Sequence, residues 1–265
     1  MKKLHLYLLF LIFPFHCIIS QQQKVQVTPV SIQKIDADIF EGYDGLGNSY
    51  YIKNNIFFKK DENNIWQYKN VTLGKITKVD LQNPLKIVLF YENFNSVVLL
   101  DNQLNEVQKI NFSKNPIPLV VTATGISSQN QLWVYDSLNQ QIGLFDYLKN
   151  NYKAVSTSFP ESIKMYQSDF NTFYWIDNNN NWFSCDIFGK ITTKGKIADF
   201  DFIEIINDQQ FIYSKNNVLI FEDLKKKGKY KIEISEKTFQ KFYYKDQILS
   251  IFTSKGIINY KITTP

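Results

Sequence analysis

One pattern recurs along this chain about every 40 residues, and it limits the fold more than any other feature of the sequence. An apolar run meets a short polar turn, and a second apolar run follows and ends on an acid. A repeat of this length with strand-like composition is typical of arrays in which each repeat forms one small β-sheet. The copies are LWVYDSLNQQIGLFD (132–146), YYIKNNIFFKKD (50–61), LFYENFNSVVLLD (89–101), FYWIDNNNNWFSCD (173–186), FIYSKNNVLIFED (211–223) and, without the closing acid, LSIFTSKGIINY (249–260).

These repeats predict an all-β, six-bladed β-propeller built from four-stranded antiparallel blades. Short runs rich in Ile, Val, Phe, Tyr and Trp alternate with turn residues, and no long segment after the N-terminus has helical spacing. Five or seven blades are the alternatives, because the last unit is degenerate. The six units are expected at residues 35–69, 77–112, 119–156, 163–196, 202–234 and 239–262.

The last unit has room for only three strands before the chain stops. The segment Lys24–Gln33 is strand-like and precedes the first unit, so it is predicted to supply the missing outer strand. A blade built from both ends of the chain would close the ring and leave no open blade. Pro29 fits an outer strand, where its missing N–H would face solvent.

Residues 1–20 have the pattern of a secretory signal peptide. Lys2 and Lys3 precede a compact apolar stretch, and Ser20 offers a small residue for cleavage. We therefore expect residues 21–265 to form a single propeller domain that is exported and is periplasmic, outer-membrane-associated or secreted. The alternatives are a retained N-terminal anchor and a lipoprotein acylated at Cys17.

Composition excludes several kinds of chemistry once that segment is removed. Both histidines, His5 and His16, lie within it, and Cys185 is then the one remaining cysteine. Histidine-dependent triads, zinc sites and c-type haem attachment are therefore not expected, and no intrachain disulfide can form. All 30 basic side chains are lysines. Nucleic acid is not an expected partner, because bidentate recognition of phosphate or guanine favours arginine.

The acids that close the repeats are the most regular polar residues in the chain. They end the third strand of each predicted blade, so each is expected to accept hydrogen bonds from N–H groups of the following turn. A residue that recurs in every unit is expected to serve the repeat rather than a single site. These acids are Asp61, Asp101, Asp146, Asp186 and Asp223.

The segment 132–146 resembles the core of NHL-type repeats, in which an apolar strand, an acid, an Asn-containing turn and a second strand ending in Phe-Asp follow one another. The matching residues are Leu132, Val134, Asp136, Asn139, Ile142, Phe145 and Asp146. The signal segment, the Gln-led start and the composition are similar to exported propeller proteins of the Bacteroidetes. Resemblance to lactonase-like propellers would imply Ca²⁺ in the axial channel, with Asp199, Asp201 and Glu204 as the candidate ligands.

The function that the sequence favours is a non-enzymatic scaffold that binds another envelope or outer-membrane protein. Its candidate contacts are loop residues, namely Tyr43, Asp44, Phe94, Tyr147 and Phe170, of which the aromatic rings are expected to be exposed. A metal-dependent lactonase or lyase and a carbohydrate-binding propeller with a glycan ligand are the alternatives. No catalytic residue and no cofactor are assigned, and Cys185 is expected to be a buried, inert thiol.

Overall fold

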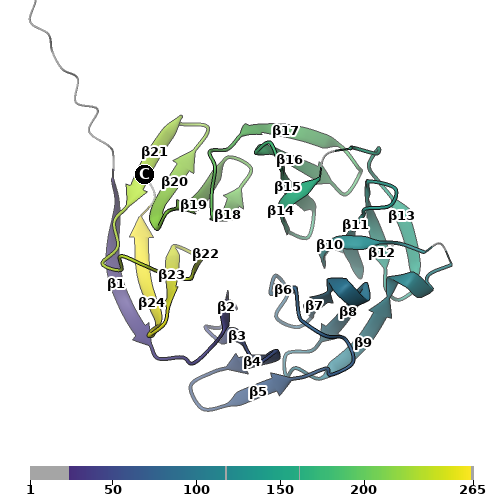
Figure 1. The fold of residues 1–265 in the computed structure, drawn as a ribbon, viewed down its shortest axis with the longest axis horizontal. Coiled ribbons are helices and arrows are strands. Elements are labelled where there is room, and N and C mark those ends of the chain that lie inside the picture. Colours follow the sequence, from purple (N-terminus) through teal and green to yellow (C-terminus); the bar gives the residue numbers. More distant parts are fainter. Residues whose placement is uncertain (1–23, 117, 161, 264–265) are drawn as a thin grey trace, which may run out of the picture.

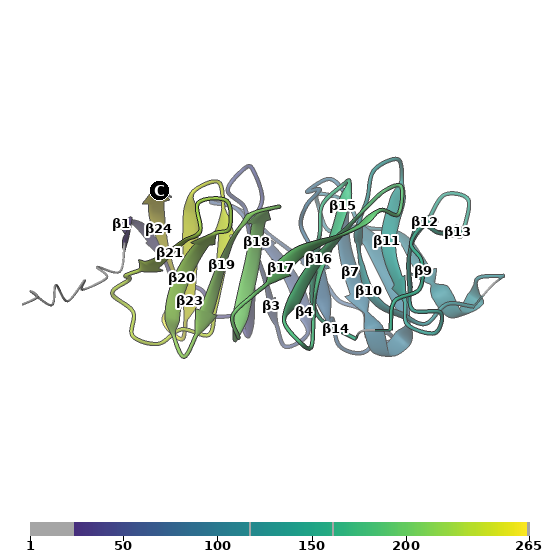
Figure 2. The ribbon, with the colours of Figure 1, turned by 90° about the horizontal axis from the view of Figure 1, so that it is seen from above.

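The computed structural model describes residues 24–116, 118–160 and 162–263. The described residues form β-strands arranged in small sheets around a central axis, like the blades of a propeller (Figure 1). Seen from the side, the molecule is a disc whose strands run through its thickness (Figure 2). The all-β propeller prediction is therefore confirmed. The predicted signal peptide lies outside the described residues.

Each blade runs from an innermost to an outermost strand. The strands of blades 1 to 3 are β2 (Ile39–Tyr43), β3 (Ser49–Lys53), β4 (Ile56–Lys60) and β5 (Ile65–Tyr68); β6 (Lys78–Asp80), β7 (Ile87–Tyr91), β8 (Ser96–Leu100) and β9 (Glu106–Asn111); and β10 (Val121–Ile126), β11 (Gln131–Asp136), β12 (Gln141–Asp146) and β13 (Asn151–Ala154). Two short 3-10 helices, η1 (Glu92–Phe94) and η2 (Phe112–Lys114), lie in connections. No helix of the described chain is long and apolar enough to cross a membrane.

Blades 4 to 6 continue the same order. Their strands are β14 (Ile163–Ser168), β15 (Thr172–Asp177), β16 (Asn181–Asp186) and β17 (Ile191–Lys196); β18 (Phe202–Asn207), β19 (Gln210–Lys215), β20 (Val218–Asp223) and β21 (Gly228–Ile232); and β22 (Lys241–Lys245), β23 (Ile248–Thr253), β24 (Gly256–Thr263) and β1 (Lys24–Gln33). The predicted unit boundaries are close to these. The clearest differences are β2, which begins at Ile39 rather than at residue 35, and β10, which begins two residues late at Val121.

The predicted closing strand exists. β1 pairs antiparallel with β24 from Gln26 opposite Thr263 to Gln33 opposite Ile257, with a bulge between Pro29 and Ser31. Its first two residues also pair in parallel with β21 of blade 5, which the sequence did not predict. That extra pairing joins blades 5 and 6 into one eight-stranded sheet, and dividing this sheet at the β21–β1 pair gives six four-stranded units.

Asparagine-rich turns explain how neighbouring strands reverse so tightly. Asn54 and Asn55 between β3 and β4 have φ of 51° and 60°, and Asn216 and Asn217 between β19 and β20 have φ of 50° and 61°. Two successive residues with positive φ make the type I′ turn that matches the twist of a hairpin, and asparagine tolerates this conformation. These two Asn pairs therefore specify two-residue hairpins.

The hydrophobic core consists of separate clusters, each between two neighbouring blades. Trp133, Trp175 and Trp182 are fully buried in the clusters on either side of blade 4, as expected for large flat side chains that fill the gap between blades. The cluster between blades 6 and 1 is the smallest, with Phe40, Phe252 and Ile257 as its buried members. Antiparallel strands alternate in direction, so the turns between first and second strands share one face of the disc with the turns between third and fourth strands.

Candidate functional site

The repeated acids have the structural role predicted for them. Each carboxylate accepts hydrogen bonds from the turn that follows its strand, as Asp101 does from the backbone N–H groups of Gln103 and Asn105, both at 2.8 Å. Burial tends to raise the pKa of Asp101, but these bonds and one from the Asn105 side chain outweigh it and hold the pKa below its usual value. The same pattern of turn hydrogen bonds is present at Asp61, Asp146, Asp186 and Asp223.

Two further acids, Asp136 and Asp177, lie at the ends of second strands. They also accept hydrogen bonds from the following turn, and they are more deeply buried. Asp177 accepts hydrogen bonds from the backbone N–H groups of Asn179 and Asn181 and from the Asn181 side chain, all at 2.8 Å. Both side chains are almost fully buried. We call these two residues, together with the five repeated acids, the turn carboxylates.

Tyr43 and Asp44, which were predicted to contact a partner, form their hydrogen bonds with other residues of the chain. Asp44 is buried and accepts hydrogen bonds from its own turn and, at 2.9 Å, from the hydroxyl of Tyr50. Tyr43 is half-buried, donates to the Gln33 side chain at 2.9 Å and packs edge-on against Phe40. Tyr43 therefore supports the joint between blades 6 and 1, and Asp44 stabilises a turn within blade 1.

The expectation of an exposed ring at Tyr147 is wrong. Its exposed fraction is 3%, and its hydroxyl bonds to the side chains of Asn130 and Lys86, which lie on neighbouring turns. Phe94 and Phe170 are exposed as expected, but Phe94 lies between second and third strands and Phe170 between first and second strands, so they are on opposite faces. They do not form one flat platform for a sugar.

One exposed ring was missed. Phe188 lies in the turn between β16 and β17 and is 86% exposed. Thr172 pairs with Asp186 in the β15–β16 ladder, so the turns that carry Phe170 and Phe188 leave the same end of blade 4. The sequence feature that could have identified Phe188 is its position two residues after Asp186. Leu148 has the same position after Asp146 and is also exposed.

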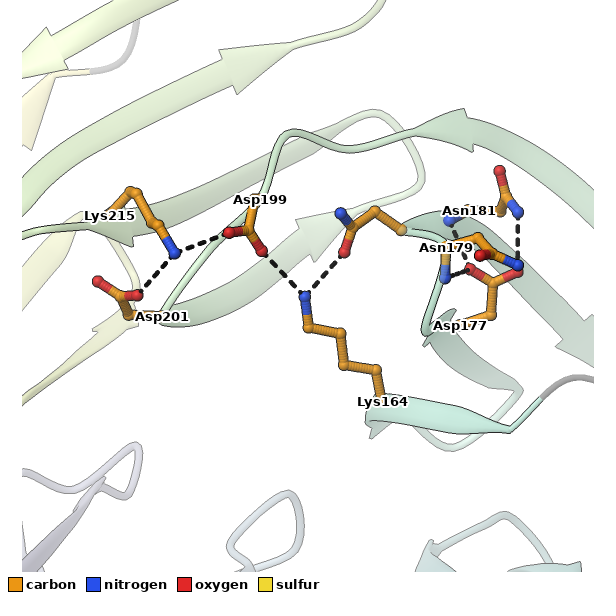
Figure 3. Close-up of polar contacts among 8 residues, drawn as sticks. Lys164, Asp177, Asn179, Asn181, Asp199, Asp201 and Lys215 are labelled. Atoms are coloured by element: carbon orange, nitrogen blue, oxygen red, sulfur yellow. Dashed lines mark hydrogen bonds and ion pairs between the residues drawn. The ribbon is translucent and has the colours of Figure 1, made fainter.

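The three candidate calcium ligands do not come together. Asp199 and Asp201 both contact Lys215, at 2.7 and 3.2 Å, and Asp199 also contacts Lys164 at 3.2 Å (Figure 3). Their partner lysines hold the pKa of Asp199 at about 2. Glu204 lies instead inside the ring, and the described residues contain no group of three acids, cysteines or histidines placed to hold a metal.

An axial cavity of about 600 Å³ lies in the described part of the molecule. Its wall takes side chains from the innermost strand of every blade, β2, β6, β10, β14, β18 and β22, which surround the axis (Figure 1). Turn residues such as Gln82, Asp169 and Asp246, all between first and second strands, also line it. The cavity therefore opens on the face that carries those turns, which we call the cavity face.

Six charged side chains from the innermost strands line this cavity. Lys241 of β22 contacts Glu41 of β2 at 3.1 Å, which forms an ion pair between blades 6 and 1. Asp80 of β6 accepts hydrogen bonds from the backbone N–H groups of Gln82, at 2.8 Å, and Ile126, at 2.7 Å. Burial nevertheless raises the pKa of Asp80.

The other three charges, Glu204 of β18, Lys78 of β6 and Lys245 of β22, have no oppositely charged contact among the described residues. The Glu204 carboxylate makes no hydrogen bond or ion pair with a described residue, and the Lys78 ammonium lies 5.3 Å from the ring centre of Tyr166. Burial raises the pKa of Glu204, and Lys78 and Lys241 lower it to a smaller extent. Blades 5 and 2 are three units apart in the ring, so strands β18 and β6, which carry Glu204 and Lys78, lie across the axis from one another (Figure 1).

Two tyrosine hydroxyls near the cavity and the Cys185 thiol are held in their neutral forms. Burial raises the pKa of the Tyr166 and Tyr243 hydroxyls, so both stay protonated hydrogen-bonding groups at neutral pH. The Tyr243 ring lies so close to Gly42 that a Cβ there would come within 2.6 Å of it. Cys185 is fully buried away from the axis, as predicted, and burial raises its thiol pKa to about 12.

Solved structures share this fold at very low sequence identity. A catalytically inactive virginiamycin B lyase from Staphylococcus aureus, with quinupristin, is 9% identical with a TM-score of 0.59, over 91% of this chain and 100% of that one. A protein of unknown function from Bacteroides thetaiotaomicron is 11% identical with a TM-score of 0.59, over 92% and 74%. YCF48 bound to D1 peptide is 12% identical with a TM-score of 0.52, over 88% and 82%. No protein-family model and no curated protein sequence matches this chain.

Proposed function

We propose that this chain is an exported, non-enzymatic β-propeller that binds another protein of the cell envelope through its cavity face. The observation that carries this proposal is the pair of exposed rings, Phe170 and Phe188, on two turns of blade 4 at that face. Asp169, the residue before Phe170, lines the cavity, so Phe170 lies beside its mouth, whereas Phe188 lies farther from the axis on the same face, between β16 and β17. Aromatic side chains are enriched at the centres of protein interfaces.

Hydrogen bonds hold the backbone of both turns that carry these rings. The Phe170 carbonyl accepts hydrogen bonds from the Ser128 backbone N–H and the Ser127 hydroxyl, both at 3.0 Å, and the neighbouring Asp169 carbonyl accepts one from Trp133 at 2.9 Å. Asp186 holds the turn of Phe188 by accepting its N–H at 2.9 Å. A rigid mount lowers the ordering cost of binding, which favours these rings as anchors.

Other exposed apolar side chains extend the surface around these two rings. Leu46, Leu85 and Leu148 occupy turns of blades 1, 2 and 3 on the cavity face, and each is exposed by more than half. The segment 1–20 supports export, as in the Bacteroidetes propellers that the sequence resembles. YCF48, of the same fold, is known bound to a peptide, which is consistent with a propeller that receives a polypeptide.

Site-specific photo-crosslinking in envelope fractions tests this proposal. A crosslinker at position 188 is expected to join the chain to one partner, and Phe170→Ser should weaken that product strongly. A crosslinker at position 138 is the matched control, because Leu138 is 68% exposed on the opposite face. Equal products from both positions, or none from position 188, would reject the proposal. Glycan binding that depends on both rings would replace it with the carbohydrate-binding alternative.

A catalytic role is the second candidate, and the raised pKa of Glu204 inside the cavity is the observation that favours it. A buried carboxyl with such a pKa is suited to donate or accept a proton. Mass spectrometry after incubation with quinupristin, the compound found with the lyase of the same fold, is a direct test. Product that forms with the wild type but not with Glu204→Gln would support an enzyme, and unchanged quinupristin would reject this lyase activity.

A further inference from the structure

The axial cavity contains charged side chains that have no oppositely charged partner among the described residues. Of its six charged side chains from the innermost strands, Glu41 and Lys241 satisfy one another, and Asp80 receives two backbone N–H groups. Glu204, Lys78 and Lys245 are left without an ionic partner among the described residues, and Glu204 is the one acid of the three. A carboxylate that has lost much of its water and gained no hydrogen bond is costly, so such groups usually meet a cation or take up a proton.

Two of these unpaired charges, Glu204 and Lys78, are opposite in sign and belong to opposite walls. Glu204 is on β18 of blade 5 and Lys78 on β6 of blade 2, with the cavity between them. Lys78 lowers the pKa of Glu204, so each charge senses the other, although they are too far apart to form an ion pair. A site of this kind is complementary to a molecule that carries both charges in the reverse order.

We propose that the axial cavity binds a small zwitterion, a free amino acid or a short peptide, with its ammonium group at Glu204 and its carboxylate at Lys78. A volume of about 600 Å³ lies in the range of small-ligand pockets. Thr124, Tyr166 and Tyr243 add hydroxyl groups to the wall. This inference does not rest on the proposed protein partner, since the ligand lies inside the ring.

The walls beside the two charges favour this orientation. The Lys78 ammonium over the Tyr166 ring is attracted to the ring face and keeps its N–H groups free for a carboxylate. At the joint between blades 6 and 1, the Glu41–Lys241 pair offers no net charge to compete with either end of the ligand. Glu204 therefore provides the acceptor for an ammonium group, and Lys78 provides the donor for a carboxylate.

Isothermal titration of the full chain tests the inference. The probes are the twenty free L-amino acids and glycylglycine, in phosphate buffer, because amine buffers such as Tris would compete at Glu204. At least one probe is expected to bind. Glu204→Gln and Lys78→Met should each weaken that probe about tenfold or more, since each removes one charged contact.

Blocked probes assign each end of the ligand. Acetylation of the amino group should cost binding in the wild type but little in Glu204→Gln, and amidation of the carboxylate should behave in the same way with Lys78→Met. Free amino acids and glycylglycine are titrated separately. The probe that binds with the higher affinity identifies the length of the ligand.

Asp199→Asn is the matched control, because it changes charge by the same amount at an exposed acid outside the cavity. It should bind as the wild type does. Circular dichroism and thermal melting establish that each variant is folded. The inference is overturned if no probe binds the folded wild type. It is also overturned if Glu204→Gln and Lys78→Met bind the probe as tightly as the wild type does.

Discussion

Two sets of carboxylates in this molecule have opposite environments. The turn carboxylates receive several N–H groups each, and hydrogen bonds lower the pKa of Asp61, Asp101, Asp146 and Asp223. The cavity carboxylates Asp80 and Glu204 have lost water, and burial raises their pKa. Acids that recur in every repeat stabilise the fold, whereas an acid that occurs in one blade and lacks a partner is the better candidate for binding.

The largest expected effect is at a buried turn carboxylate. Asp177→Ala removes an almost fully buried carboxylate and leaves three donors of Asn179 and Asn181 without their acceptor in a partly buried turn. We expect the free energy of unfolding to fall by about 3 kcal/mol, because each unsatisfied buried donor is costly. Urea denaturation measures it, with Asp199→Asn as the control at an exposed acid. A loss below that of the control would show that the turn does not depend on its carboxylate.

A smaller loss is expected at an exposed turn carboxylate. Asp101→Ala removes the same kind of acceptor, but water can reach the N–H groups of Gln103 and Asn105 once the carboxylate is gone. We expect a decrease of about 1 kcal/mol in the free energy of unfolding. Asp101→Asn, which keeps one acceptor oxygen, should lose less than Asp101→Ala in the same urea experiment. Equal losses would mean that charge, rather than hydrogen bonding, is the main contribution.

The features that the sequence predicted correctly depend on local chemistry. The turn carboxylates, the Asn-rich hairpins and the strand pattern each follow from a few adjacent residues, and β1 was identified because the last unit lacked a strand. The incorrect expectation, an exposed Tyr147, failed because the side chains that cover it, Asn130 and Lys86, come from other turns of the ring. No local pattern contains that contact.

The cavity could not be predicted in the same way. Inner strands carry bulges, between Phe40 and Gly42 in β2 and between Ile205 and Asn207 in β18. A bulge shifts the alternation of side chains, so counting along the strand does not tell which residues face the axis. Glu41 is the extra residue of its bulge and lines the cavity. The opposition of Glu204 and Lys78 also depends on which blades stand across the ring.

Removal of the Glu204 charge should change the free energy of unfolding in the opposite direction to removal of a turn carboxylate. Glu204→Gln takes away a desolvated charge that has no hydrogen-bonded partner, so the free energy of unfolding should be unchanged or raised by up to about 1 kcal/mol. Urea denaturation at pH 7 in amine-free buffer measures it, beside Asp101→Asn as the matched acid-to-amide change. A clear loss of stability would mean that the carboxylate has a structural partner within the ring.

The smallest effect is a difference in pH dependence between the two sets. The raised pKa of Glu204 means that the folded chain holds this proton more tightly than the unfolded chain, so stability is lost as pH rises from about 4.5 through the folded pKa. Asp101 has a lowered pKa, so its contribution is present above about 3.8 and is lost as pH falls through the folded pKa. The advantage of Glu204→Gln over the wild type should therefore appear above pH 4.5, while the deficit of Asp101→Asn should shrink below pH 3.8. Urea midpoints across the acid range measure both, and parallel profiles for wild type and Glu204→Gln would contradict a titrating carboxylate in the cavity.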